Sequence, residues 1–227
     1  MPKKYGVVPD HNLFINLMRH EATREDIESS RALLEYATKR KRIFTSSKRK
    51  GFLSRYLDSN KDSMDADALR EYIRILSNYK IRDFDMDSVD ERVGRVIAIY
   101  SENGFTNEFN LARDKATLVP RRFRHMAKLI YIDQISEDEK KKREDGRYMP
   151  EATDIKLIGY ASLLTGEFER VFLASCDRGI IGRKEGREVA AKIEKEFSIR
   201  IDHPSAVLEE IRALDASAVV IPKVQTA

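Results

Sequence analysis

The sequence has only one cysteine, Cys176, among its 227 residues, so a disulfide within the chain is excluded. It also has no apolar run approaching the roughly 20 residues needed to cross a bilayer. The opening residues, Met-Pro-Lys-Lys, show no signal-peptide pattern. These absences argue against a disulfide scaffold and a membrane protein, and we expect a globular protein in the reducing cytoplasm.

Several common ligand-binding motifs are missing as well. Gly179, Gly182 and Gly186 form neither a Walker loop nor a dinucleotide-binding fingerprint. The four histidines do not have the spacing of a zinc site. Cys176 ends an apolar run that predicts a buried strand, where cysteine usually behaves as an inert small hydrophobic residue.

The composition is that of a folded protein with a heavily charged surface, since 41% of residues are hydrophobic and 35% are charged. The net charge is +4, and its distribution is uneven. Eight basic residues and no acidic ones lie from Lys39 to Arg55, and a second basic group lies within residues 121–128. Such clusters attract phosphate backbones, although a solvated helix face is the alternative explanation for each.

Short apolar runs predict strands that alternate with helices. A capping box at Thr23–Asp26 predicts the start of one helix, Ser46 or Ser47 the start of another, and Thr153 the cap of a helix from Asp154. This alternation predicts an α/β fold, with a central parallel sheet of about four or five strands flanked by helices. The expected strands are residues 5–8, 42–45, 170–175 and 199–201, with 216–221 as a candidate edge strand.

The middle of the chain has a different pattern. Apolar residues recur at helical spacing between residues 58 and 147, with no convincing buried strand among them. We therefore expect an α/β core from residues 1–57 and 148–227, and a helical insertion or subdomain from residues 58–147.

Three aspartates lie at positions where an α/β sheet commonly binds ligands. Asp10 and Asp177 each follow an expected strand, and Asp154 lies at an expected helix start. Strand tips and helix starts of an open α/β sheet face the same crevice, where carboxylates suit a hard cation such as Mg²⁺ or Mn²⁺. Local hydrogen bonding at helix caps is the alternative explanation for each aspartate.

The segments around these aspartates resemble the PIN-domain nuclease family. Residues 7–15, VVPDHNLFI, are similar to the opening strand of that family, where Asp-x-Asn leads into an apolar helix. Residues 153–161, TDIKLIGYA, resemble the helix start that bears a later acid, and VFLASCD at 171–177 resembles the strand that closes on Ser/Thr-x-Asp. The resemblance covers roughly residues 3–57 and 148–215.

The resemblance implies a PIN-like α/β/α fold and a metal-dependent endoribonuclease. By analogy, Asp10, Asp154 and Asp177 would be catalytic and hold Mg²⁺ or Mn²⁺, while Asn12 and Ser175 would orient these carboxylates or the metal-bound waters. Nucleic acid, as single-stranded or structured RNA, would be the partner, and a homo-oligomer or a protein partner is compatible with the sequence. The residues expected to contact the nucleic-acid backbone are Lys48, Arg49, Lys50, Arg121, Arg122 and Arg124.

The chain departs from the family at the helix after the second strand, where PIN nucleases usually place a glutamate. That region reads TSSKRKG at residues 45–51 and has no acid. Glu151 is a candidate for the fourth carboxylate instead. Two hypotheses follow: an active nuclease, or a PIN-like module that has lost catalysis and serves in RNA binding or assembly. A small-molecule phosphate-ester hydrolase is a third, less favoured hypothesis, because the sequence supplies no phosphate loop.

Overall fold

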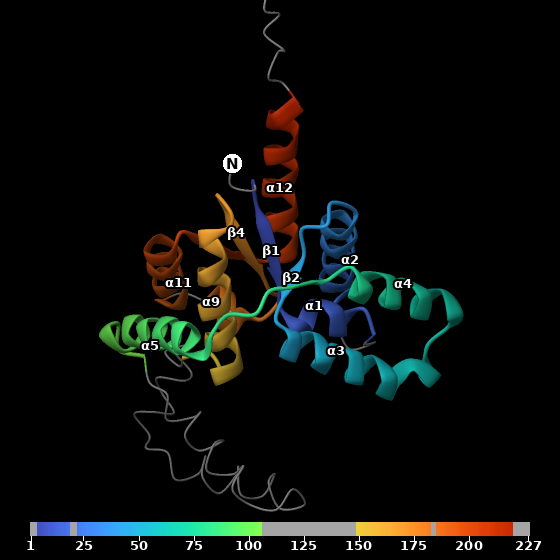
Figure 1. Cartoon of the computed structure of the whole chain (residues 1–227), viewed down its shortest axis with the longest axis horizontal. Coiled ribbons are helices and arrows are strands. Elements are labelled where there is room, and N and C mark those ends of the chain that lie inside the picture. The colour runs from blue at the N-terminus through green and yellow to red at the C-terminus, as the bar shows by residue number, and fades with distance from the viewer. Residues whose placement is uncertain (1–3, 19–21, 106–148, 183–184, 220–227) are drawn as a thin grey trace, which may run out of the picture. The chain divides into compact units, whose positions relative to one another are not determined.

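The computed structural model describes residues 4–18, 22–105, 149–182 and 185–219 (Figure 1). These residues form two compact units. The first unit takes its described residues from 1–83, 164–176 and 199–227, and the second from 84–163 and 177–198.

The first unit is built on a parallel sheet of three strands in the order β1-β4-β5. These strands are β1 (Gly6–Pro9), β4 (Val171–Ala174) and β5 (Ile199–Asp202). Figure 1 shows β1 and β4 side by side. In this parallel pair Val8 lies opposite Leu173. β1 and β4 are buried along their whole length, which is why both are continuous apolar runs. Because the strands are parallel, their carboxyl ends share one edge of the sheet.

A second, smaller sheet pairs β2 (Phe44–Thr45) with β3 (Lys80–Ile81), again in parallel. A parallel bridge between Val7 and Ile43 joins the residue before β2 to β1. The small sheet therefore continues the strand direction of β1, so that the end of β2 and the start of the next helix lie near the end of β1.

Helices pack on these strands in the first unit. Thr23 Oγ accepts a hydrogen bond from Asp26 N at 3.1 Å, and Ser46 Oγ accepts one from Arg49 N at 3.3 Å, so both expected caps are present. The side chains of one buried cluster come from β1, β4 and the five α-helices that the described residues of this unit form. The helices are α1 (His11–Asn16), α2 (Arg24–Lys39), α3 (Ser47–Asn60), α4 (Ala66–Ser77) and α12 (Pro204–Val219).

The carboxylate of Asp215, on α12, accepts hydrogen bonds from other parts of the first unit. Asp215 Oδ2 accepts hydrogen bonds from the hydroxyls of Tyr5 and Tyr36, at 2.9 and 3.0 Å, and from Arg40 Nε at 2.7 Å. Tyr5 precedes β1, whereas Tyr36 lies on α2 and Arg40 directly follows that helix. The contact therefore joins the last described helix to the first strand and to α2.

The described residues of the second unit form helices α5 (Met86–Glu102), α9 (Ala152–Leu163), α10 (Arg178–Ile181) and α11 (Glu185–Phe197). Its closest packing is between α5 and α9 (Figure 1). A Cβ atom at Gly159 would lie 3.2 Å from the Val93 side chain, so the glycine permits this close approach. Gly182, with φ of 82°, turns the chain between α10 and α11, where a Cβ atom would lie 2.5 Å from backbone atoms of Gly186.

The coarse fold class predicted from the sequence is confirmed: the chain is mixed α/β, with parallel strands flanked by helices. The four main predicted strands are present at β1, β2, β4 and β5. Among the described residues they form one sheet of three strands and one of two, which differs from the predicted single sheet.

Three local predictions were wrong. The predicted middle region contains a strand, β3, that the pattern did not indicate. Residues 216–219 continue helix α12 and are not an edge strand. The helix carrying Asp154 begins at Ala152, so Thr153 lies inside its first turn and does not cap it.

The two units also divide the chain differently from the predicted core and insertion. β3 and α4 belong to the first unit because β3 pairs with β2 and α4 buries Tyr72 and Ile75 in its core. Helix α9 belongs to the second unit because it packs on α5. The predicted helix around residues 123–131 and the polar run 136–147 lie outside the described residues.

None of the described helices combines the length and the apolar character that crossing a bilayer requires.

Candidate functional site

Asp10 lies directly after β1 and is only 3% exposed. Its backbone continues the sheet, since Asp10 N donates to Ala174 O at 2.8 Å. Its Oδ1 caps α1 by accepting from His11 N at 2.6 Å, and its Oδ2 accepts from the Ser175 hydroxyl at 2.9 Å. Ser175 directly follows β4, so the ends of two adjacent parallel strands hold this carboxylate.

A guanidinium from α3 lies beside the same carboxylate. Arg49 Nη2 is 3.6 Å from Asp10 Oδ1 and 2.8 Å from His11 Nδ1. Because a guanidinium only donates hydrogen bonds, His11 Nδ1 accepts here, and the neutral ring then carries its proton on Nε2. Phe52 packs edge-on against this imidazole, with ring centroids 4.8 Å apart. We call Asp10, His11, Arg49 and Ser175 the Asp10 cluster.

The electrostatics of the Asp10 cluster favour the ionised carboxylate. Burial alone raises the pKa of Asp10, but the contacts with His11, Arg49 and Ser175 lower it, and the net pKa is below its usual value. Asp10 is therefore a buried anion at neutral pH, and Arg49 is its closest cation. A buried anion at the end of a parallel sheet is stabilised by a bound cation or by a positively charged side chain.

Near the Asp10 cluster, one buried tyrosine hydroxyl makes no hydrogen bond to the described residues. Tyr79 is 3% exposed, and within the described residues its hydroxyl has no hydrogen-bond partner. Burial raises the pKa of Tyr79 against the opposing charge of Arg49, so the hydroxyl stays protonated at neutral pH. Lys50 Nζ donates to the backbone oxygen of the same tyrosine at 3.2 Å. The segment before β3 therefore brings a neutral donor close to two basic residues of α3.

The other two aspartates of the predicted site belong to the second unit. Asp177 Oδ1 accepts from Gly179 N at 2.6 Å, and this carboxylate therefore stabilises the start of the short helix α10. Asp154 lies in the first turn of α9, and its backbone N donates to Glu151 O at 2.8 Å. Both aspartates thus lie at helix starts, where a negative charge interacts favourably with the helix dipole.

The remaining predicted residues are distributed as follows. Asn12 is half-buried on α1, two residues from Asp10, and Glu151 is exposed directly before α9. Lys48 and Lys50 flank Arg49 in the first turn of α3, with Lys48 exposed. The second basic group, Arg121, Arg122 and Arg124, lies outside the described residues.

The Asp10 cluster alone does not supply a full set of ligands for Mg²⁺ or Mn²⁺. Such ions prefer several oxygen ligands in octahedral geometry, and within the first unit the predicted triad contributes only Asp10. Both carboxylate oxygens of Asp10 already have partners.

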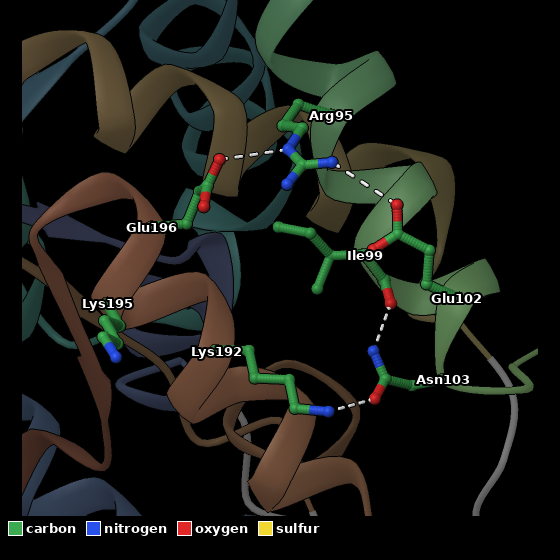
Figure 2. Close-up of a pocket in the computed structure, with 7 residues that line it drawn as sticks. All are labelled: Arg95, Ile99, Glu102, Asn103, Lys192, Lys195 and Glu196. Carbon is green, nitrogen blue, oxygen red and sulfur yellow. Dashed lines mark hydrogen bonds and ion pairs between the residues drawn. The ribbon is translucent and has the colours of Figure 1, made fainter.

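A separate cavity of about 630 Å³ lies in the second unit, between α5 and α11 (Figure 2). Arg95 pairs with two acids on the wall, Glu196 at 3.0 Å and Glu102 at 3.4 Å, and Lys192 donates to the amide oxygen of Asn103. The charge of Arg95 is therefore compensated by neighbours on the cavity wall. None of the residues predicted to be functional lines this cavity.

Comparison with protein-family models, curated proteins and solved structures finds no match for this chain.

Proposed function

We propose that the chain is a PIN-like endoribonuclease that hydrolyses RNA phosphodiester bonds with Mg²⁺ or Mn²⁺. The observation that supports this proposal best is the buried, ionised carboxylate of Asp10. It lies at the carboxyl end of β1 and is held by Ser175 at the end of the adjacent strand. The carboxyl ends of parallel strands are where α/β proteins usually bind ligands.

In this proposal Asp10, Asp154 and Asp177 hold the cation. Such a cation stabilises the attacking and leaving oxygens of a phosphodiester and lowers the pKa of the attacking water. Ser175 fixes the Asp10 carboxylate by donating to Oδ2. Lys48, Arg49 and Lys50 hold the RNA backbone at the start of α3, where the N-terminal end of a helix also favours phosphate.

The test is cleavage of single-stranded RNA by the full chain in the presence of Mn²⁺. The Asp10→Asn variant keeps the shape and the hydrogen-bond acceptor of the side chain but removes its charge. We expect a loss of at least 100-fold in the cleavage rate. Asp65→Asn is the matched control, because Asp65 also caps a helix of the first unit, yet it is outside the Asp10 cluster.

The control variant is expected to cleave at the wild-type rate, and circular dichroism checks that both variants fold. Cleavage by Asp10→Asn at the rate of Asp65→Asn would refute the nuclease proposal.

A second candidate function is RNA binding without cleavage. The observation that favours it is the position of Arg49, 3.6 Å from Asp10, since a guanidinium beside the carboxylate partly replaces a metal ion as its counter-charge. The first turn of α3 also has no acidic residue. This function predicts RNA affinity that is the same in EDTA as in Mn²⁺, together with no cleavage in either solution.

A further inference from the structure

Three side chains that are far apart in the sequence meet in the first unit. Asp26 lies in the first turn of α2, Cys176 follows β4 by two residues, and His203 lies between β5 and α12. One ligand atom from each residue lies within 4.8 Å of the other two. All three side chains are half-buried, so each is held by the fold and remains accessible to a small ion.

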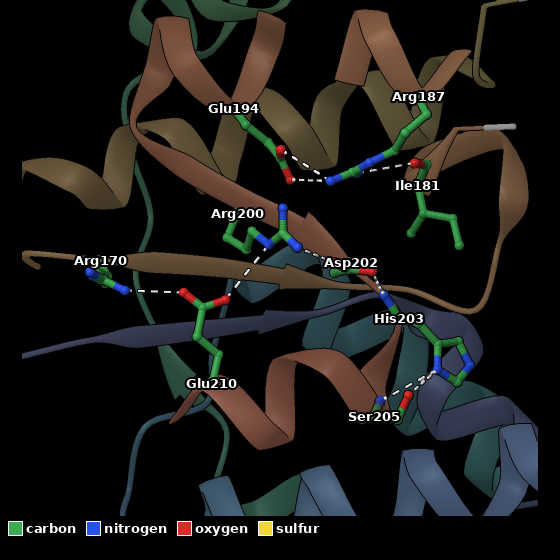
Figure 3. A network of polar contacts seen from close by, with 9 residues as sticks. All are labelled: Arg170, Ile181, Arg187, Glu194, Arg200, Asp202, His203, Ser205 and Glu210. Atoms are coloured by element: carbon green, nitrogen blue, oxygen red, sulfur yellow. Dashed lines mark hydrogen bonds and ion pairs between the residues drawn. The ribbon is translucent and has the colours of Figure 1, made fainter. Parts of the chain in front are cut away.

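The imidazole of His203 is oriented from both sides. Its Nε2 lies 3.1 Å from Asp26 Oδ1, and its Nδ1 lies 2.8 Å from the Ser205 hydroxyl (Figure 3). The backbone N of His203 donates to Asp202 Oδ1 at 2.8 Å, which fixes the residue at the end of β5. The ring therefore directs Nε2 toward Asp26 and the other members of the group.

The cysteine also has a polar neighbour. The hydroxyl of Ser30, a fully buried residue of α2, lies 3.6 Å from Cys176 Sγ. A hydroxyl in this position can donate to a thiolate and so stabilise its charge. Cys176 also packs against the buried cluster of the first unit, as its sequence position predicted, and burial raises the pKa of its thiol against the opposing hydrogen bond from Ser30.

We propose that Asp26, Cys176 and His203 bind a borderline-soft divalent cation of the zinc type. Thiolate sulfur and imidazole nitrogen are the ligands that zinc selects, whereas Mg²⁺ and Mn²⁺ prefer oxygen ligands alone. Three protein ligands leave the fourth tetrahedral position to a water molecule or a substrate.

The neighbours of His203 and Cys176 suit metal binding. Without an ion, the backbone N of Ser205 donates to His203 Nδ1 at 3.4 Å, so the ring proton lies on Nε2 and faces Asp26 Oδ1. Coordination of an ion by Nε2 would move the proton to Nδ1, which would then donate to the Ser205 hydroxyl 2.8 Å away. Cys176 binds as the thiolate, with Ser30 donating to the sulfur, and its proton is released to solvent. Both ligands thus have an outer partner of the correct donor or acceptor character.

The same contacts argue against a cysteine nucleophile activated by histidine. Such a nucleophile needs a ring nitrogen that accepts the thiol proton. In His203, one ring nitrogen is paired with Asp26 and the other with Ser205. The three side chains therefore have the geometry of a ligand group, which is independent of the proposed nuclease function.

Co²⁺ titration of the metal-free full-length chain tests this site, because cobalt bound to a thiolate gives a sulfur-to-cobalt charge-transfer band. We expect this band together with the visible spectrum of tetrahedral Co²⁺, and we expect Zn²⁺ to abolish both. Cys176→Ser should remove the charge-transfer band. His203→Gln should weaken Co²⁺ binding more than Ser205→Ala, for which the expected loss is about 10-fold.

A matched control separates this site from its neighbours. Glu25→Gln changes an exposed acid beside Asp26 in the same helical turn. This variant should keep the cobalt spectrum of the wild type. If Cys176→Ser does not fold, His203→Gln provides the test, because it keeps the thiol.

Either of two results would overturn the proposal. The first is the absence of a charge-transfer band at saturating Co²⁺ in the wild-type chain. The second is a band whose intensity and cobalt affinity are unchanged in both Cys176→Ser and His203→Gln.

Discussion

A buried carboxylate is stable only when hydrogen bonds and neighbouring charges replace the water that it has lost. Asp10 has the His11 backbone, the Ser175 hydroxyl and the Arg49 guanidinium as such replacements. The groups that stabilise this anion also surround the candidate site. A change in one of them should therefore affect both folding and function.

Removing Arg49 should destabilise the fold. Arg49→Ala leaves Asp10 buried without its nearest positive charge, and we expect the free energy of unfolding to fall by about 1–3 kcal/mol. Urea denaturation measures this loss. Lys48→Ala is the control, because Lys48 is exposed in the same turn, and its effect should stay within about 0.5 kcal/mol. Equal stability of the two variants would show that Arg49 does not compensate Asp10.

The pH dependence of stability should depend on the same carboxylate. The folded pKa of Asp10 is below its usual value of 3.8, so the ionised group stabilises the fold above that value. This contribution is lost as the pH falls through the lower, folded pKa. We expect the stability difference between wild type and Asp10→Asn to be constant from pH 7 to about pH 5 and to shrink below about pH 4. Urea denaturation across this pH range checks it, and a constant difference down to pH 2 would contradict it.

At the scale of elements, Asp215 of α12 makes hydrogen bonds that reach α2 and the residue before β1. Asp215 accepts hydrogen bonds from Tyr5, Tyr36 and Arg40, and Tyr5 is almost fully buried. Loss of this acceptor leaves a buried tyrosine hydroxyl without its partner.

Asp215→Ala should therefore lower the free energy of unfolding by about 1–3 kcal/mol. Glu209→Ala is the matched control, since it removes an exposed acid from the same helix, and its effect should stay within about 0.5 kcal/mol. Thermal and urea denaturation measure both variants. A loss no larger than that of the control would mean that packing alone holds α12.

The elements that the sequence predicted well are those with an unambiguous pattern. β1 and β4 were predictable because a parallel strand buried on both faces is a continuous apolar run. β3 was not, because Lys80 and Ile81 are only two residues, and one of them is charged. Residues 216–219 are small and, except for Ser217, apolar, which fits a strand or a helix, and these residues continue the helix α12.

The candidate site was only partly predictable for a related reason. The Asp-x-Asn motif indicated Asp10, and the strand that ends at Ser175 indicated its companion. Sequence spacing could not indicate that Arg49 lies beside Asp10, because that contact depends on how β2 and α3 follow the sheet. It likewise could not indicate the group of Asp26, Cys176 and His203, whose members come from three separate elements.

At the scale of the whole molecule, the chain passes between the two units at residues 83–84, 163–164, 176–177 and 198–199. Asp10 belongs to one unit, and Asp154 and Asp177 belong to the other.

The salt dependence of the RNA affinity should give the number of phosphate groups that the protein neutralises. For single-stranded RNA, the logarithm of affinity should fall linearly with the logarithm of salt concentration, by about 0.7 for each phosphate neutralised. Lys48→Ala should reduce this slope by about 0.7, because Lys48 is exposed at the start of α3. Fluorescence anisotropy at several salt concentrations measures the slope. Glu25→Gln is the control, and equal slopes for both variants would exclude a role for Lys48.

The pairing of β1 with β4 has a consequence for the order in which the protein folds. Residues 6–9 find their sheet partner at residues 171–174, and that strand in turn pairs with residues 199–202. Contacts between such distant parts of a chain slow folding, because a long loop must close first. During synthesis, the first strand therefore leaves the ribosome long before its partner exists, and the three-stranded sheet can be completed only after residues 199–202 have been made.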